Sequence, residues 1–233
     1  MLSDRQIERY SRQIILPQVG GKGQERLLRT RVLVSGDGPW QAQALLYLVA
    51  AGVGHVGICG IEHPPILTAL TSESQASASF AFPPLNPDCA LVVHDHQQLC
   101  DFAKAAQLVQ QYDLVIAEPN VQLHAVCHAT RRPFFCGMAR AVTAWFAVYR
   151  GYEDDLPCLA CEPLPQPETI SSSCIDWPVG SFLGTVIGTE AMKWILGLSS
   201  TNAAKLSWYQ FPALIFHERV LAKNPHCSVC QRQ

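Results

Sequence analysis

The chain has 233 residues, of which 48% are hydrophobic and 15% charged, and its formal net charge is −2. This composition is typical of a globular protein with a large interior, and the length suits one or two domains. The charge balance gives no electrostatic basis for binding nucleic acid or an anionic membrane. The opening stretch MLSDRQIERYSRQ lacks the apolar core of a signal peptide, so a cytoplasmic protein is expected.

The first thirty or so residues carry helical signals. One helix is expected over residues 4–11 and a short one over Gln24–Leu28, joined by a turn-rich link. Arg9 and Arg12 lie three positions apart and would share a helix face. On composition alone this segment is a solvated amphipathic arm.

A βαβ unit follows the arm. An apolar β-branched run predicts a strand at Val32–Val34, and a Gly-x-Gly turn comes next at Gly36 and Gly38. The apolar stretch Trp40–Ala51 predicts a helix, and Val53–Cys59 a second strand. This arrangement is the first half of a dinucleotide-type fold, in which the turn offers backbone N–H groups to a phosphate.

The turn departs from the G-x-G-x-x-G pattern of nucleotide sites. Gln41 stands at the third glycine position, and Pro39 removes a backbone N–H. Trp40 is large enough to fill part of the phosphate pocket. The second strand ends on Gly60 instead of an acidic residue that would bind ribose, and Glu62 is a substitute two positions late.

The middle of the chain predicts a second α/β portion after an irregular loop at residues 61–84. Alternating strands and helices indicate a mainly parallel sheet covered on both faces. The expected strands are Cys89–His94, Leu114–Ala117, Pro133–Gly137 and Ala144–Arg150, and the expected helices are Cys100–Gln111 and Gln122–Thr130.

A second irregular loop, residues 154–178, leads to a helix at Pro178–Leu196. Glycine recurs every fourth position in this helix, at Gly180, Gly184 and Gly188, which indicates close approach of another backbone. Two strands are expected in the tail between Lys205 and Leu221.

Four of the ten cysteines form two C-x-x-C pairs, Cys158/Cys161 and Cys227/Cys230. Four thiolates in this spacing can bind structural Zn²⁺ tetrahedrally. The alternatives are two redox dithiols or free buried thiols. No targeting signal points to an oxidising compartment, so a disulfide framework is not expected.

The order of motifs resembles the ThiF/MoeB/HesA family of E1-like proteins, which activate ubiquitin-like sulfur carriers. The resemblance runs through ERYSRQIILPQVGGKGQERLLRTRVLVSGDG, ALLYLVAAGVGHVGI, YDLVIAEPN, PCLACEP, VGSFLGTVIGTEAMKWILGL and NPHCSVC. It implies one domain over residues 1–233, comprising an arm (1–30), an α/β core (31–150) and a C-terminal part (151–233). The implied fold is α/β, a Rossmann-like mainly parallel sheet flanked by helices, with C-terminal strands and a zinc-knuckle tail.

The resemblance also implies a chemistry, in which a carrier's C-terminal carboxylate attacks the α-phosphate of ATP. Arg12 matches an arginine that reaches the partner subunit's ATP site in the family. Gly36 and Gly38 keep part of the turn, and Asn120 stands where the family has an aspartate that binds Mg²⁺. Residues 61–87 contain no arginine or lysine, although the family has both there. In some relatives the cysteine matching Cys174 bonds covalently to the carrier, although here an exposed spare thiol is the alternative.

With so many groups missing, ATP and Mg²⁺ binding is doubtful, and we expect a non-catalytic homologue acting as a dimeric binding or partner module. It would form a homodimer, or a heterodimer with an intact E1-like relative, and could bind a small Gly-Gly carrier. The alternatives are an active ATP-dependent adenylyltransferase for a sulfur carrier, and a redox or zinc-storage protein.

Overall fold

The computed structural model describes the chain except residues 61–85, 154, 162–175, 199–204, 212 and 231–233. Its centre is an eight-stranded sheet in the order β3-β2-β1-β4-β5-β6-β7-β8. The strands are β1 (Arg31–Ser35), β2 (His55–Cys59), β3 (Ala90–His94), β4 (Leu114–Ala117), β5 (Phe134–Arg140), β6 (Thr143–Tyr149), β7 (Lys205–Gln210) and β8 (Ile215–Val220).

The strands from β3 to β5 pair in parallel, whereas β6, β7 and β8 add antiparallel strands to one edge. This confirms the expected mainly parallel sheet with C-terminal strands. The strand order reverses between β1 and β4, which lie side by side. In open α/β sheets ligands bind outside the carboxyl ends of the strands at such a reversal. The glycine turn after β1 lies at this point.

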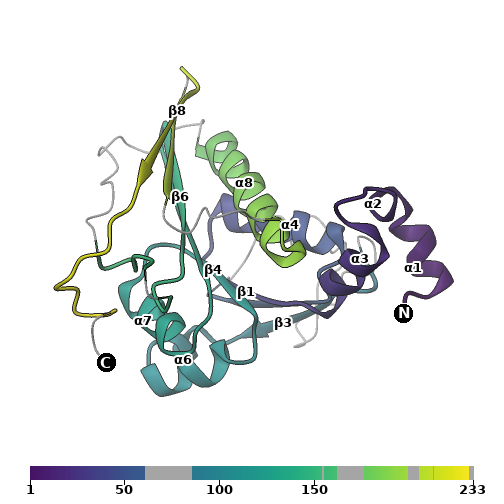
Figure 1. Ribbon diagram of the computed structural model, residues 1–233, viewed down its shortest axis with the longest axis horizontal. Helices are drawn as coiled ribbons and strands as arrows, with labels where there is room; N and C mark the ends of the chain where they lie inside the picture. The colour runs from purple at the N-terminus through teal and green to yellow at the C-terminus, as the bar shows by residue number, and fades with distance from the viewer. Residues whose placement is uncertain (61–85, 154, 162–175, 199–204, 212, 231–233) are drawn as a thin grey trace.

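Helices cover both faces of the sheet (Figure 1). They are α1 (Asp4–Arg9), α2 (Ser11–Ile14), α3 (Gly20–Arg29), α4 (Pro39–Ala51), α6 (Phe102–Val109), α7 (Val121–Ala129) and α8 (Asp176–Leu196), with a 3₁₀ turn η1 (His96–Leu99). One hydrophobic cluster joins α4 and α8 to the sheet, and a second joins α6 and α7 to its other face. None of the described helices is long and apolar enough to cross a membrane.

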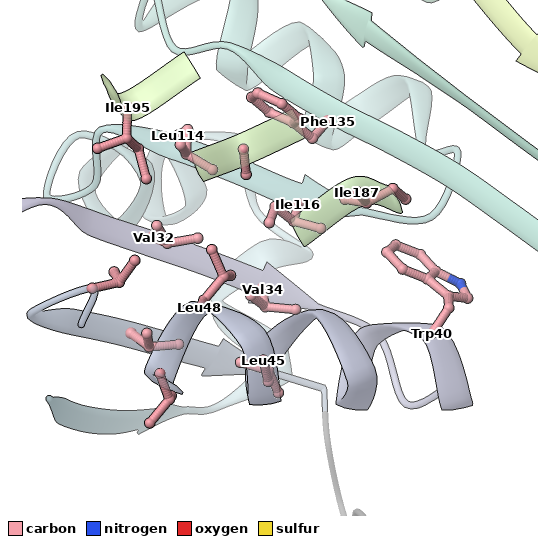
Figure 2. Close-up of a cluster of buried hydrophobic side chains, with 14 of the residues drawn as sticks. Val32, Val34, Trp40, Leu45, Leu48, Leu114, Ile116, Phe135, Ile187 and Ile195 are labelled. Atoms are coloured by element: carbon pink, nitrogen blue, oxygen red, sulfur yellow. The ribbon is translucent and has the colours of Figure 1, made fainter. Parts of the chain in front are cut away.

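The alternation of side chains along β1 builds both clusters. Val32 and Val34 point to α4 and α8, Leu33 points to α6 and α7, and all three are fully buried. Trp40 belongs to the first cluster and projects from the first turn of α4 toward Ile187 of α8 (Figure 2). The expectation that Trp40 fills a phosphate pocket is therefore wrong, because its ring lies in the hydrophobic core.

The glycine stripe on α8 lets this helix approach α4 closely, as expected. A Cβ on Gly184 would collide with the carbonyl oxygen of Trp40 and lie 2.7 Å from Cβ of Gln43. A Cβ on Gly180 would come within 2.9 Å of Pro39. The backbone of α8 thus fixes the first turns of α4, immediately after the glycine turn.

The N-terminal arm differs from the sequence expectation. The first helix ends at Arg9, and Tyr10 separates it from α2, so Arg9 and Arg12 do not share the face of one helix. The helix expected at Gln24–Leu28 is α3, which starts earlier, at Gly20, in the segment expected to be a turn-rich link. Tyr10 is buried, and its hydroxyl is hydrogen-bonded to Asn86 and Asp88 ahead of β3. These contacts fix Tyr10 at the break between α1 and α2.

Candidate functional site

The glycine turn after β1 is filled by a side chain of the same turn. The Gln41 side chain is fully buried, and its Oε1 accepts a hydrogen bond from the backbone N–H of Gly38 at 3.1 Å. A Cβ at either Gly36 or Gly38 would collide with this carboxamide. Gly36 has a φ of +115°, which only glycine adopts readily. The glycines therefore make room for Gln41, and one N–H that could have bound a phosphate is already paired.

Across the strand-order reversal, the segment after β4 adds an acidic group and an amide. Glu118 lies beside the turn, where its Oε1 accepts a hydrogen bond from Nε2 of Gln41 at 3.5 Å. Asn120 is the N-cap of α7, and its Oδ1 accepts the backbone N–H of Leu123 at 2.9 Å. The oxygen with which Asn120 could approach a cation is thus already used to cap a helix.

The two arginines of the arm have different environments. Arg9 forms an ion pair with Asp88 at 3.3 Å and is part of the contact that holds the arm against the body. Arg12 is exposed, and among the described residues its guanidinium has no hydrogen bond or ion pair. Its side chain is therefore accessible to a second molecule.

The four cysteines of the C-x-x-C pairs come together, although 69 positions separate the first pair from the second. Their sulfur atoms all lie within 4.8 Å of one another. The Cys158–Cys227, Cys161–Cys230 and Cys158–Cys161 separations are 3.4, 3.6 and 3.8 Å. Tetrahedral Zn–S bonds of about 2.3 Å would place sulfurs about 3.8 Å apart. The cluster could therefore hold a metal such as zinc.

The surroundings of the cluster fit a metal with four thiolates. Burial raises the pKa of Cys158, and burial also raises the pKa of Cys230 to about 11. Burial acts the same way on Cys227, but the backbone N–H groups of Cys230 and Val229 outweigh it and lower this pKa to about 7. Backbone N–H groups directed at sulfur stabilise thiolates, and a bound cation displaces the remaining protons.

A buried histidine next to the cysteine cluster was missed by the sequence analysis. His124 of α7 is 1% exposed, and its Nε2 accepts the backbone N–H of Leu159, between the first two cysteines, at 3.4 Å. Burial and the nearby His128 lower its pKa to about 3. The sequence signal was only a histidine on the apolar face of a helix. Glu62 and Cys174 lie outside the described residues.

Comparisons with known proteins agree with this architecture. Residues 10–61 match the ThiF family. An adenylyltransferase and sulfurtransferase MOCS3 of Drosophila yakuba is 34% identical over 259 aligned positions, and that of Drosophila ananassae is 34% identical over 256. Both alignments cover the whole chain but only 55% of the relative, so the chain spans about half the length of these curated proteins.

Solved structures share the fold. The crystal structure of E. coli MccB with ATP has a TM-score of 0.74 at 16% identity, covering 95% of this chain and 74% of that one. The SeMet PaaA structure has a TM-score of 0.72 at 16% identity, covering 95% and 75%. The solved structures show the fold, and the sequence matches over residues 10–61 and over the whole chain show that the chain belongs to the ThiF/MoeB family of E1-like proteins.

Proposed function

We propose that this chain is a non-catalytic member of the E1-like family, acting as a dimeric binding or partner module. The observation that carries the proposal is the Gln41 carboxamide inside the glycine turn. An anion at this position would have to displace a buried side chain from its hydrogen bond with Gly38. Displacing a buried polar group without replacing its hydrogen bonds costs about 1–3 kcal/mol.

Electrostatics support the same conclusion. ATP and a carrier carboxylate together bring about four to five negative charges, which an adenylating site must offset. Here Glu118 places a further carboxylate beside the turn, and the oxygen of Asn120 caps a helix. The alignment with the Drosophila yakuba protein needs 259 positions for 233 residues, so the relative has residues that this chain lacks. Independently of that alignment, residues 61–87 of this chain contain no arginine or lysine to offset the charge of a triphosphate.

The direct test of this proposal is ATP–pyrophosphate exchange with candidate Gly-Gly carriers, together with calorimetry in ATP and MgCl₂. We expect no exchange and weak or absent ATP binding. Micromolar binding, or carrier-dependent exchange that Arg12→Ala abolishes, would instead support an active adenylyltransferase with a rearranged site. Asn120→Asp alone should not produce exchange, because the missing cations are not restored.

The partner role rests on the arm. Arg12 is exposed, and so are three apolar side chains of the same arm, with Ile7 and Leu16 each 48% and Ile15 71% exposed. Exposed apolar residues grouped with an unpaired cation are typical of an interface. We expect light scattering to give a dimer, formed by two copies or with an intact E1-like relative. A monomer at all accessible concentrations, with no relative captured in a pull-down, would contradict this role.

A further inference from the structure

A cavity of about 570 Å³ lies between α7, the start of α6, the turn after β6 and the segment carrying the second cysteine pair. The turn contributes Gly151, which follows the end of β6. Because Tyr149 at that end pairs with Phe134 at the start of β5, the cavity lies at the amino ends of the parallel strands. The glycine turn lies at their carboxyl ends, so the two places are separate.

The cavity gathers hydrogen-bond donors of several kinds. Arg131, Tyr152 and Ser228 contribute a guanidinium, a phenol and a hydroxyl. His128 and Lys223 also line the cavity, but Nε2 of His128 already donates to the carbonyl oxygen of Gly151 at 3.1 Å, and Lys223 has a partner of its own. Burial raises the pKa of Tyr152 to about 12, so the phenol keeps its proton. The carboxylate in the wall, Glu153, is already ion-paired with Arg150 at 3.1 Å. With that carboxylate already neutralised by Arg150, the guanidinium of Arg131 and the neutral donors Tyr152 and Ser228 are the groups that suit an oxyanion.

Two aromatic side chains give the cavity an apolar part. Phe102 is 57% exposed at the start of α6, and the ring of Tyr152 lies under the guanidinium of Arg131, whose carbon is 5.5 Å from the ring centroid. Exposed aromatic surface beside cations favours a ligand that combines a negative group with a flat apolar body.

Arg131 occupies a backbone position that disfavours it. Its φ is +55°, in the left-handed region, directly after the C-cap of α7. Glycine is the usual residue at this position because it lacks a Cβ. A non-glycine residue in this conformation is strained, and such strain concentrates at functional sites. Arg131 therefore stands where a glycine would make the easier turn.

We propose that this cavity is a binding site for a small organic oxyanion, a phosphate or carboxylate attached to a flat apolar group, with Arg131 as its main anchor. The proposal is independent of the glycine turn and of the proposed non-catalytic function. The competing explanation is that Arg131 and Lys223 only offset the negative charge of thiolates at the neighbouring Cys230, which also lines the cavity.

The variant Arg131→Gly separates these explanations, because glycine accepts the local φ while the guanidinium is lost. Calorimetry with phenyl phosphate, benzoate and inorganic phosphate would be run on the full chain carrying its metal, with Arg5→Gln on α1 as a control for the loss of one exposed cation. We expect saturable binding of phenyl phosphate or benzoate, with inorganic phosphate weaker. The stronger of the first two identifies the preferred oxyanion.

In Arg131→Gly the binding should weaken at least tenfold, while the melting temperature stays equal or rises and the zinc content is unchanged. The Arg5→Gln control should bind as the parent chain does. The proposal is overturned if the parent chain shows no saturable binding, or if Arg5→Gln weakens binding as much as Arg131→Gly. Loss of zinc or a lower melting temperature in Arg131→Gly would equally overturn it, since Arg131 would then serve the metal cluster or the helix end.

Discussion

At the scale of single residues, Gln41 shows how one side chain can close an anion site without changing the fold. Gln41 lies in the first turn of α4 and caps the helix, because its side chain accepts the backbone N–H of the N-cap residue Gly38. The same contact stabilises the helix start and removes a donor from the turn. A side chain that the fold uses for capping can thus favour the stability of the chain and oppose nucleotide binding.

The variant Gln41→Gly should reopen the turn. It loses a buried hydrogen bond and gains backbone freedom, so we expect a stability loss of about 1–2 kcal/mol. The free N–H of Gly38 should then bind phosphate, and 50 mM phosphate should raise the melting temperature of the variant more than that of the parent chain. Gln41→Glu, which keeps a side chain of the same size in the turn, should show no such gain. If phosphate raised the melting temperature of all three proteins equally, Gln41 would not be what keeps phosphate out of the turn.

His124 gives the chain a definite pH dependence. Its folded pKa is about 3, against an ordinary value of 6.5, because the imidazole is buried on α7. Below pH 6.5 the unfolded chain binds a proton that the folded chain does not. The contribution of His124 is therefore fully present above pH 6.5 and is lost as the pH falls toward 3, by about 1.4 kcal/mol per unit.

The pH dependence can be isolated with His124→Gln, which can still accept the N–H of Leu159 but does not titrate. Urea unfolding at pH 7 and pH 5 should show the parent chain losing more stability than the variant, by about 2 kcal/mol. Comparing the two proteins cancels the acid sensitivity of the cysteine cluster, which both share. Equal losses in both proteins would mean that His124 is not neutral in the folded state.

At the scale of elements, the contact between α4 and α8 positions the glycine turn and depends on one stripe of glycines. Gly184→Ala should destabilise the chain by about 1–3 kcal/mol, because the added Cβ collides with the backbone of α4. Gly188→Ala is the matched control, since its Cβ would lie 3.6 Å from Ala44 and alanine favours a helix. Thermal unfolding should show a lower melting temperature for Gly184→Ala only. Equal decreases in the melting temperatures of both variants would contradict this packing.

The elements that the sequence predicts well are those in which the spacing of apolar or small residues along the chain matches the side of the strand or helix that is buried. The strand at Val32–Val34 and the glycine stripe of α8 are examples, because their patterns follow directly from packing on both sides. The start of α3 was missed because three glycines among residues 20–23 lower the helix propensity of this segment. In the structure, packing against α8 outweighs that low propensity. The direction of Trp40 could not be predicted, since it depends on how α8 lies across α4. The contact between Gln41 and Glu118 could not be predicted either, since it depends on the pairing of β1 with β4.

At the scale of the whole molecule, the cysteine cluster joins the segments that follow two strands of the antiparallel edge of the sheet, β6 and β8, which end on the same side. Cys158 and Cys161 follow β6, and Cys227 and Cys230 follow β8. Leu221 is buried in the second core cluster, but much of the chain after it is exposed. The cysteine cluster is therefore a main attachment of the segment that carries Cys227 and Cys230.

We therefore expect one zinc ion per chain, and its removal should loosen the tail before the sheet. Metal binding by four thiolates is coupled to folding, so Cys227→Ser should lower stability by more than about 2 kcal/mol, or roughly 5 °C in melting temperature. Hydrogen exchange should speed up after residue 221 while β1 and β4 stay protected, because these strands are buried by helices on both faces. Cys100→Ser is the control, since this exposed cysteine lies outside the cluster and should leave metal content and exchange unchanged. Purified protein without zinc, or faster exchange throughout the sheet in Cys227→Ser, would show that the four cysteines do not form a metal site that stabilises only the C-terminal segment.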